Sequence, residues 1–166
     1  MEWLHPGGAL RARDRIDKAE AFPTCPAHVL TTPAGDPRSR PSVDPDTSRG
    51  AEVVAIAMRY LGIPYRWGAA DPGVGFDCSG LTSYVYAKVG ISLPHYAAAQ
   101  YGHGVAVAKE DLQPGDLVFF RGLGHMGMYV GGGNFVHAPH TGDVVKISSL
   151  SDDYYVRTWV GARRVL

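Results

Sequence analysis

Residues 75–89 read GFDCSGLTSYVYAKV, a glycine-flanked turn that leads directly into a stretch with the hydrophobic period of a helix. The apolar positions that carry this period are Leu81, Val85 and Val89. We therefore predict a helix over residues 78–89, with Cys78 in its first turn. A thiol there feels the positive end of the helix dipole, and free backbone N–H groups favour its thiolate or a developing oxyanion. A buried structural cysteine is the alternative, and this segment alone supports both interpretations equally.

The elements around this helix follow an order that is typical of an α+β domain. A first helix is predicted over residues 51–62, and a short helical turn over residues 96–101. Beyond residue 115 the pattern becomes that of strands, at residues 116–121, 125–131, 134–139, 144–150 and 154–166. Helices followed by a run of antiparallel strands predict the α+β class.

Two histidines lie on neighbouring predicted strands. His125 opens the strand HMGMYVG, His137 lies in NFVHAP, and the glycines 131–133 form the turn between them. In the resulting register residue 125 lies opposite residue 139, and residue 127 opposite His137. His125 and His137 then become diagonal neighbours on one face, although a slip of one residue would separate them. A pair on one face, with a thiol at a helix start, favours catalysis over two ordinary strand histidines.

Three motifs in order resemble the NlpC/p60 family of cell-wall cysteine peptidases, over roughly residues 51–150. They are PYRWGAADPGVGFDCSGL at 64–81, QPGDLVFF at 113–120 and GHMGMYVGGGNFVHAP at 124–139. The resemblance implies a papain-like α+β fold, with N-terminal helices packed on a mostly antiparallel sheet of five to six strands. It also implies that the catalytic cysteine stands at a helix N-terminus.

The resemblance assigns roles residue by residue. Cys78 of DCSG matches the nucleophile, His125 of GHMGMY the general base, and His137 of FVHA the polar residue that orients the base. Tyr65 of PYRWG matches a tyrosine near the nucleophile that assists the oxyanion site, with ordinary aromatic packing as the alternative. Asp77 and Ser79 flank the nucleophile at positions that contact the amino end of a stem peptide in related enzymes; helix capping is the alternative for both.

The chain departs from the family pattern near the cleft. Relatives often read LPR followed by a hydroxyl residue, whereas this chain reads LPHYAAAQ, with His95 and Tyr96. The departure leaves substrate choice open at this point. Trp67 and Gly68 are expected to shape the core and a tight turn rather than to touch substrate.

The function that the resemblance implies is hydrolysis of bacterial peptidoglycan by a thiol endopeptidase. The substrate would be the stem peptide, cleaved between γ-D-glutamate and a diamino acid, with no metal and no organic cofactor. Two alternatives remain. One is an N-acetylmuramoyl-L-alanine amidase or other thiol acyl transfer on the same fold, and the other is a non-catalytic wall-binding module.

Composition limits the possible partners. The 166 residues carry 16 basic and 16 acidic side chains, so the net charge gives no reason to expect nucleic acid or an anionic membrane as the main partner. No apolar run is long enough to span a bilayer, so membrane insertion is not expected. Two cysteines build neither a disulfide-rich scaffold nor a four-thiolate zinc site. We expect a monomer that acts on a wall peptide.

The composition changes near residue 50. Residues 1–48 are rich in proline and are predicted to form an arm or linker, and residues 49–166 the peptidase domain. Cys25 in this arm is expected to be incidental, and an arm that crosses and inhibits the cleft is a hypothesis. The start MEWLHPGG is not a signal peptide, so we expect an extracellular or envelope protein that is a piece of a longer exported chain or is exported by another route.

Overall fold

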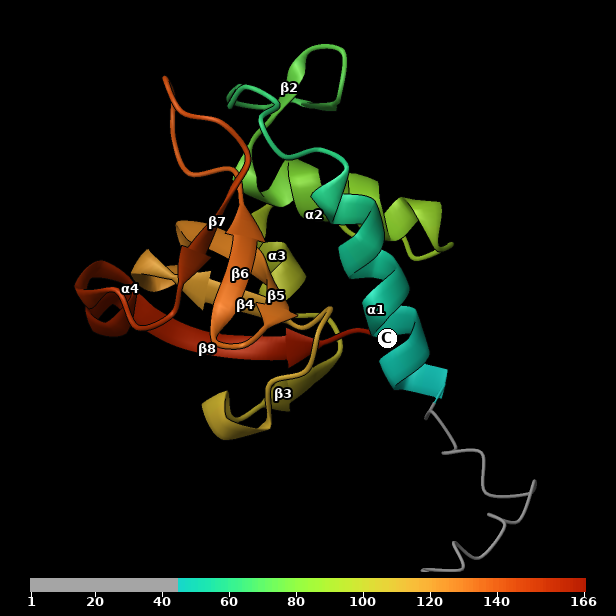
Figure 1. Ribbon diagram of the computed structural model, residues 1–166, viewed down its shortest axis with the longest axis vertical. Coiled ribbons are helices and arrows are strands. Elements are labelled where there is room, and N and C mark those ends of the chain that lie inside the picture. Colours follow the sequence, from blue (N-terminus) through green and yellow to red (C-terminus); the bar gives the residue numbers. More distant parts are fainter. Residues whose placement is uncertain (1–44) are drawn as a thin grey trace, which may run out of the picture. The chain divides into compact units, whose positions relative to one another are not determined.

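A computed structural model describes residues 45–166, which form four helices and eight strands (Figure 1). The helices are α1 Pro45–Met58, α2 Cys78–Lys88, α3 Ala97–Tyr101 and α4 Asp153–Thr158. The strands are β1 Ala70–Asp71, β2 Gly75–Phe76, β3 Val105–Val107, β4 Leu117–Phe120, β5 His125–Gly131, β6 Asn134–His137, β7 Lys146–Ser149 and β8 Trp159–Arg164. Two 3₁₀ turns, η1 Lys109–Asp111 and η2 Arg121–Leu123, flank β4.

The main sheet has six strands in the order β3-β8-β4-β5-β6-β7, and every neighbouring pair is antiparallel. The helices α1 and α2 precede it in the chain, so the predicted α+β class and the size of the sheet are confirmed. The strands β1 and β2 form a separate hairpin, directly before α2. That hairpin delivers the chain to the start of α2, where Cys78 stands.

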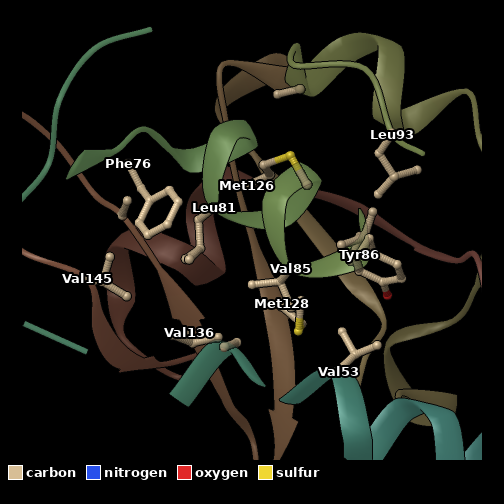
Figure 2. Close-up of a cluster of buried hydrophobic side chains, with 14 of the residues drawn as sticks. Val53, Phe76, Leu81, Val85, Tyr86, Leu93, Met126, Met128, Val136 and Val145 are labelled. Atoms are coloured by element: carbon tan, nitrogen blue, oxygen red, sulfur yellow. The ribbon is translucent and has the colours of Figure 1, made fainter. Parts of the chain in front are cut away.

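The helices α1 and α2 cover one face of the sheet and bury the larger core cluster (Figure 2). Side chains from α1, α2 and β5 meet there, among them Val53, Leu81, Val85, Tyr86, Met126 and Met128. A smaller cluster lies on the opposite face, under α4. Successive residues of β4 alternate between the two, since Leu117 and Phe119 belong to the first and Val118 and Phe120 to the second. This central strand is buried on both faces, which fixes its position beneath the helix that carries the thiol.

Most predicted elements match the structure to within two residues at each end, and two differ by more. Helix α1 begins at Pro45 and ends at Met58, earlier at both ends than predicted, because proline suits the first turn of a helix. The strand predicted over residues 154–166 is wrong in its first half, which forms α4. Tyr155 and Trp159, four residues apart, both pack against Phe120, with ring centroids at 5.0 and 5.8 Å. This packing, at the i,i+4 spacing of a helix, outweighs the strand preference of the aromatic residues.

A buried amide ties the short helix α3 to the start of α2. Gln100 is fully buried, and its Nε2 donates to the carbonyl oxygens of Ser79 at 3.0 Å and Pro94 at 2.8 Å. Its Oε1 accepts from the Thr82 hydroxyl at 2.8 Å. The amide therefore satisfies groups from both helices and from the loop between them, and it holds one wall of the region around Cys78 in place.

We predict that Gln100→Leu lowers the free energy of unfolding by roughly 2–3 kcal/mol, because the buried partners of the amide lose their hydrogen bonds. Equilibrium urea unfolding of the full chain measures this loss. The matched control is Gln113→Leu at an exposed position, for which a change within about 0.5 kcal/mol is expected. Equal stability of the two variants would show that the amide does not hold α3 to α2.

Candidate active site

Cys78 is the first residue of α2, and its position is fixed by the residue before it. Asp77 is the N-cap, with extended backbone, and its Oδ1 accepts the Gly80 N–H at 2.7 Å. The Asp77 N–H donates to the Ala69 carbonyl at 3.0 Å, which joins the helix start to the loop before β1. The half-buried thiol of Cys78 thus stands at a rigid junction of loop, hairpin and helix.

The glycine of DCSG is required by close packing. A Cβ at Gly80 would overlap the carbonyl oxygen of Ala69 and would lie 2.9 Å from both Asp77 Oδ1 and His95 Nε2. Any other residue would push the helix start away from these groups. Gly80 therefore lets the first turn of α2, and the thiol with it, approach the neighbouring loop.

Burial raises the pKa of the Cys78 thiol, and the charge of Asp77 acts in the same direction. Hydrogen bonds from the backbone N–H groups of Met126, Ser79 and Cys78 itself lower the pKa but do not outweigh the burial. The expectation that the helix start holds a resting thiolate is therefore not met, because the thiol is too poorly solvated. The N–H groups are nevertheless in place around the sulfur.

The two strand histidines contact each other. Met128 pairs with Val136 and Tyr129 with Phe135, so residue 127 lies opposite residue 137, the register predicted from the sequence. The register shifts between Tyr129 and Gly131, and β5 extends to Gly131, so the turn is shorter than the predicted three residues.

Within this register the two imidazoles form a hydrogen bond. His125 Nε2 lies 2.8 Å from His137 Nδ1, and both side chains are buried. The glycine at 127 makes room for this, since a Cβ there would lie 2.6 Å from the Phe135 ring and 3.0 Å from His137 Cβ.

Ser148 on β7 extends this contact into a chain of three groups. Its Oγ lies 2.8 Å from His137 Nε2, and the more distant Tyr155 hydroxyl lies 3.5 Å from the same nitrogen. If His125 is to accept a proton at Nδ1, then its Nε2–H donates to His137 Nδ1, and the His137 Nε2–H donates to Ser148. One tautomer of each ring therefore leaves His125 Nδ1 free to accept a proton and makes both hydrogen bonds, to His137 and to Ser148. The arrangement is that of an oriented base.

Burial lowers the pKa of His125 to about 4, and the Arg121 guanidinium adds to this effect. Burial lowers the pKa of His137 to about 3, and the charge of His125 contributes. Both rings are therefore neutral at pH 7, and the resting site pairs a neutral thiol with neutral imidazoles.

The neutral histidines make stability depend on pH. Below about pH 6.5 the unfolded chain takes up protons on these rings, whereas the folded chain does so only near pH 4. We therefore predict that the unfolding free energy falls as the pH is lowered from 6.5 to 4, by on the order of 3 kcal/mol for each of the two rings. Urea unfolding at a series of pH values measures the slope.

The variant His137→Asn isolates this effect from the titration of carboxylates. It should show a smaller loss of stability over the same interval than the unmodified chain, since one of the two rings is gone. Parallel slopes for the two proteins would contradict a buried neutral His137.

The remaining three sequence-predicted residues lie beside the thiol. Burial raises the pKa of Tyr65, which is 9% exposed, and the charges of Cys78 and Asp77 add to this, so the phenol lies close to both. Asp77 Oδ2 accepts the Gly68 N–H at 2.8 Å, and Ser79 Oγ donates to Asp77 Oδ1 at 3.3 Å. Helix capping thus accounts for the contacts of Asp77 and Ser79, while both also line the cleft.

His95 occupies the point where the sequence departs from the family pattern. Its Nε2 lies 2.7 Å from Asp77 Oδ1, and the side chain is one-third exposed. It therefore adds a further partner to the capping carboxylate, and it lines the cleft as well.

The thiol opens into a cavity of about 480 Å³. Its wall includes Cys78, Asp77, His95, Tyr96, Arg121 and Trp67. The expectation that Trp67 shapes the core is wrong, because its side chain is 86% exposed at the rim of this cavity. Gly68 does form the expected turn, with φ of +72°.

A second hollow of about 430 Å³ adjoins the first. It is lined by His125, His140, Asp152, Tyr154 and Tyr155 among others, and Arg121 lines both hollows. Cys78 lies in the wall of one and His125 in the wall of the other. The start of β5 adjoins the first turns of α2, since the Thr82 hydroxyl lies 3.8 Å from Met126 Sδ and Cys78 packs against the core cluster that contains Met126. A substrate bound across both hollows would therefore meet both groups.

Sequence reasoning missed Ser148, Arg121 and the exposure of Trp67. Ser148 could have been found by pairing the predicted strand 144–150 with 134–139, since the observed register places Lys146 opposite His137 and Ser148 diagonal to it. Nothing in the sequence pattern distinguishes Arg121 from other surface arginines.

Some predictions concern residues that the structure does not describe. Cys25 and the inhibitory arm fall within residues 1–44, outside the described part of the chain. Across residues 45–166, no three His, Cys, Asp or Glu side chains are grouped so that they could hold a metal ion. In the same residues no helix has the length and apolarity to cross a membrane.

Known proteins have sequences similar to this chain. The chain is 46% identical over 117 residues to murein DD-endopeptidase MepH of Escherichia coli K12, an alignment that covers 66% of this chain and 43% of that protein. It is 41% identical over 129 residues to the γ-D-glutamyl-L-lysine dipeptidyl-peptidase of Bacillus cereus, covering 74% of this chain and 38% of the relative. The chain therefore spans less than half the length of these curated relatives.

Solved structures agree with this similarity. A crystal structure of an NlpC/P60 family protein from Bacillus cereus superposes with a TM-score of 0.68 at 38% identity, and the match covers 70% of this chain and 40% of that one. The NlpC/P60 domain of the peptidoglycan hydrolase SagA superposes with a TM-score of 0.58 at 41% identity, covering 61% of this chain and 89% of that domain. Residues 62–164 match the model of the NlpC/P60 family. The chain belongs to the NlpC/P60 family.

Proposed function

We propose that the chain is a cysteine endopeptidase of peptidoglycan that cleaves the bond between γ-D-glutamate and a diamino acid. The observation that carries the proposal is the site itself: a cleft-lining thiol at a helix start, beside a buried histidine pair oriented by a serine. The names of the relatives support the bond, since they include a murein endopeptidase and a γ-D-glutamyl-L-lysine dipeptidyl-peptidase.

In this proposal His125 activates the thiol during attack. As Cys78 Sγ bonds to the substrate carbonyl carbon, His125 Nδ1 takes the thiol proton, because both groups rest in their neutral forms. His137 and Ser148 hold the ring and stabilise the imidazolium that forms. The proton then passes to the leaving amine, and the carbon–nitrogen bond breaks to leave a thioester.

The oxyanion of the tetrahedral intermediate needs hydrogen-bond donors. The N–H groups of Cys78, Ser79 and Met126 lower the pKa of the thiol, and the charge of Cys78 acts on the Tyr65 phenol, so these groups are the candidate donors. Water then attacks the thioester, His125 takes its proton, and the carboxylate product leaves with Cys78 restored as a thiol.

The setting of this activity is part of the same proposal. The catalytic domain begins with helix α1 at Pro45, slightly before the boundary at residue 49 that the sequence predicted, and residues 1–44 are proposed as an arm or linker. The enzyme acts in the cell envelope, where its peptidoglycan substrate lies. The expectation of a monomer stays a prediction.

Mass spectrometry of a digested muropeptide tests the function. The full chain is incubated with a disaccharide tetrapeptide, and the expected products are the disaccharide with L-Ala-γ-D-Glu and a free peptide that begins with the diamino acid. Release of the disaccharide from the whole stem would identify an amidase, and an unchanged muropeptide would identify a binding module; either result would overturn the proposal.

A further inference from the structure

Arg121 begins the turn η2 Arg121–Leu123, which follows β4 and has an unusual backbone. All three residues have positive φ, at 54°, 58° and 72°, although only the middle one is a glycine. Left-handed conformations at Arg121 and Leu123 cost energy, and such strain is concentrated at functional sites. The strained turn therefore marks Arg121 as a candidate functional residue.

The Arg121 side chain lies where the two hollows meet. It is in the wall of the Cys78 cavity and in the wall of the His125 hollow. Its charge acts on His125, which places the guanidinium near that imidazole. Arg121 therefore lies beside the position of the bond that would be cleaved.

The guanidinium is also available for a ligand. Within residues 45–166, Arg121 makes no side-chain hydrogen bond and no ion pair. Lys146, the other cation of the second hollow with a permanent charge, is paired with Asp143 at 2.6 Å, and His95 in the cavity is bound to Asp77. A positive charge without a protein partner thus faces the cleft.

The proposed substrate carries an anion at the corresponding place. A γ-glutamyl bond uses the side-chain carboxyl of glutamate, so the α-carboxylate stays free, only a few carbon atoms from the carbonyl under attack. Arginine binds carboxylates with two parallel hydrogen bonds. We propose that Arg121 is a specificity-determining residue that binds the free α-carboxylate of the γ-glutamyl residue; this inference rests on the proposed function.

The consequence is discrimination against substrates in which this carboxylate is amidated. A γ-linked glutamate and its isoglutamine counterpart differ at this group alone: the first has a carboxylate and the second a neutral amide, so only the first has a charge for Arg121 to bind. Arg121 is exposed in the substrate-free protein, and a substrate bound across both hollows would cover it. An analogue that lacks the charge would then leave the covered guanidinium without its partner, so it should bind less well.

Two tripeptides test the inference with the full-length chain: L-Ala-γ-D-Glu-L-Lys and its isoglutamine counterpart. For the unmodified enzyme kcat/KM should be roughly tenfold higher with the glutamate peptide, because the guanidinium is exposed before the substrate covers it. Arg121→Gln should lose most of this preference, by a large drop on the glutamate peptide and a change of less than about threefold on the isoglutamine peptide. Arg59→Gln, an exposed arginine after α1, is the control and should alter neither rate.

The outcomes separate the inference from the proposed function. An equal loss of kcat/KM on both peptides would mean that Arg121 supports the site without binding the carboxylate. An unchanged kcat/KM would mean that Arg121 has no role. Both results overturn the inference. Replacing L-Lys by meso-diaminopimelate should not change the effect of Arg121→Gln, and an effect that follows this replacement would assign the residue to the leaving group instead. If the unmodified enzyme cleaves none of these peptides, the proposed function fails and the inference fails with it.

Discussion

Cys78→Ala abolishes turnover of γ-D-glutamyl peptides, with kcat reduced roughly 10⁴-fold or more. The reason is that the thioester cannot form without the sulfur, and the remaining donors alone supply little acceleration. Initial rates on a defined tripeptide, followed by mass spectrometry, measure the loss. Thermal unfolding should confirm that the variant folds, since the half-buried thiol makes a small contribution to the core.

The chain supplies its own control, because it contains a second cysteine. Cys25→Ala should leave kcat and KM within about twofold of the unmodified enzyme, as expected for an incidental thiol. Retained activity in Cys78→Ala, or its loss in Cys25→Ala, would contradict the assignment of Cys78 as the nucleophile.

The second large effect is a graded loss of kcat when the three hydrogen-bonded residues His125, His137 and Ser148 are replaced in turn. His125→Ala should reduce kcat about as severely as loss of the thiol, because no other group takes the proton. His137→Ala should cost about 10²-fold, and Ser148→Ala less than about tenfold, because these groups orient the base without exchanging a proton with substrate. The losses should fall on kcat with little change in KM.

His140→Ala is the matched control for this series. His140 lines the same hollow as His125, but it is exposed, and its ring contacts the Thr141 carbonyl through Nδ1 and Asp143 Oδ2 through Nε2, at 3.7 Å, without touching the hydrogen-bonded histidine pair. Its replacement should change kcat less than about threefold. A loss in His137→Ala equal to that in His125→Ala would contradict the division between base and orienting residue.

The sequence predicted most reliably those features that depend on local pattern. The helix at Cys78 carries a cap, a glycine and a clear period, and it lies within one residue of the predicted range. The register of β5 and β6 follows from three glycines and strict alternation, and it was sufficient to place His125 beside His137.

Features that depend on distant packing could not be predicted in this way. The strands β1, β2 and β3 have two or three residues each, too few for a period to be visible. Residues 154–158 look like a strand by composition and become helical because Tyr155 packs on Phe120 and Phe135. Trp67 has the composition of a core residue, yet the loop that carries it leaves its ring exposed at the cleft.

The pKa shifts of the site residues also depend on distant packing and could not be predicted from the sequence. A helix start argues for a thiolate, but the degree of burial decides the sign of the shift, and burial is a property of the fold. Burial raises the pKa of Cys78 and lowers the pKa values of His125 and His137, so the site rests in its neutral form. Proton transfer must then accompany attack, which increases the importance of how His125 is oriented.

Trapping the acyl group with hydroxylamine tests the central claim most directly. If Cys78 forms a thioester with the γ-D-glutamyl carbonyl, hydroxylamine competes with water for it, and the thioester carbon–sulfur bond is replaced by a carbon–nitrogen bond while the thiol is restored. We predict that mass spectrometry detects L-Ala-γ-D-glutamyl hydroxamate in proportion to the hydroxylamine added, with no product from Cys78→Ala. Formation of the free carboxylate alone, at every hydroxylamine concentration, would contradict nucleophilic catalysis by Cys78.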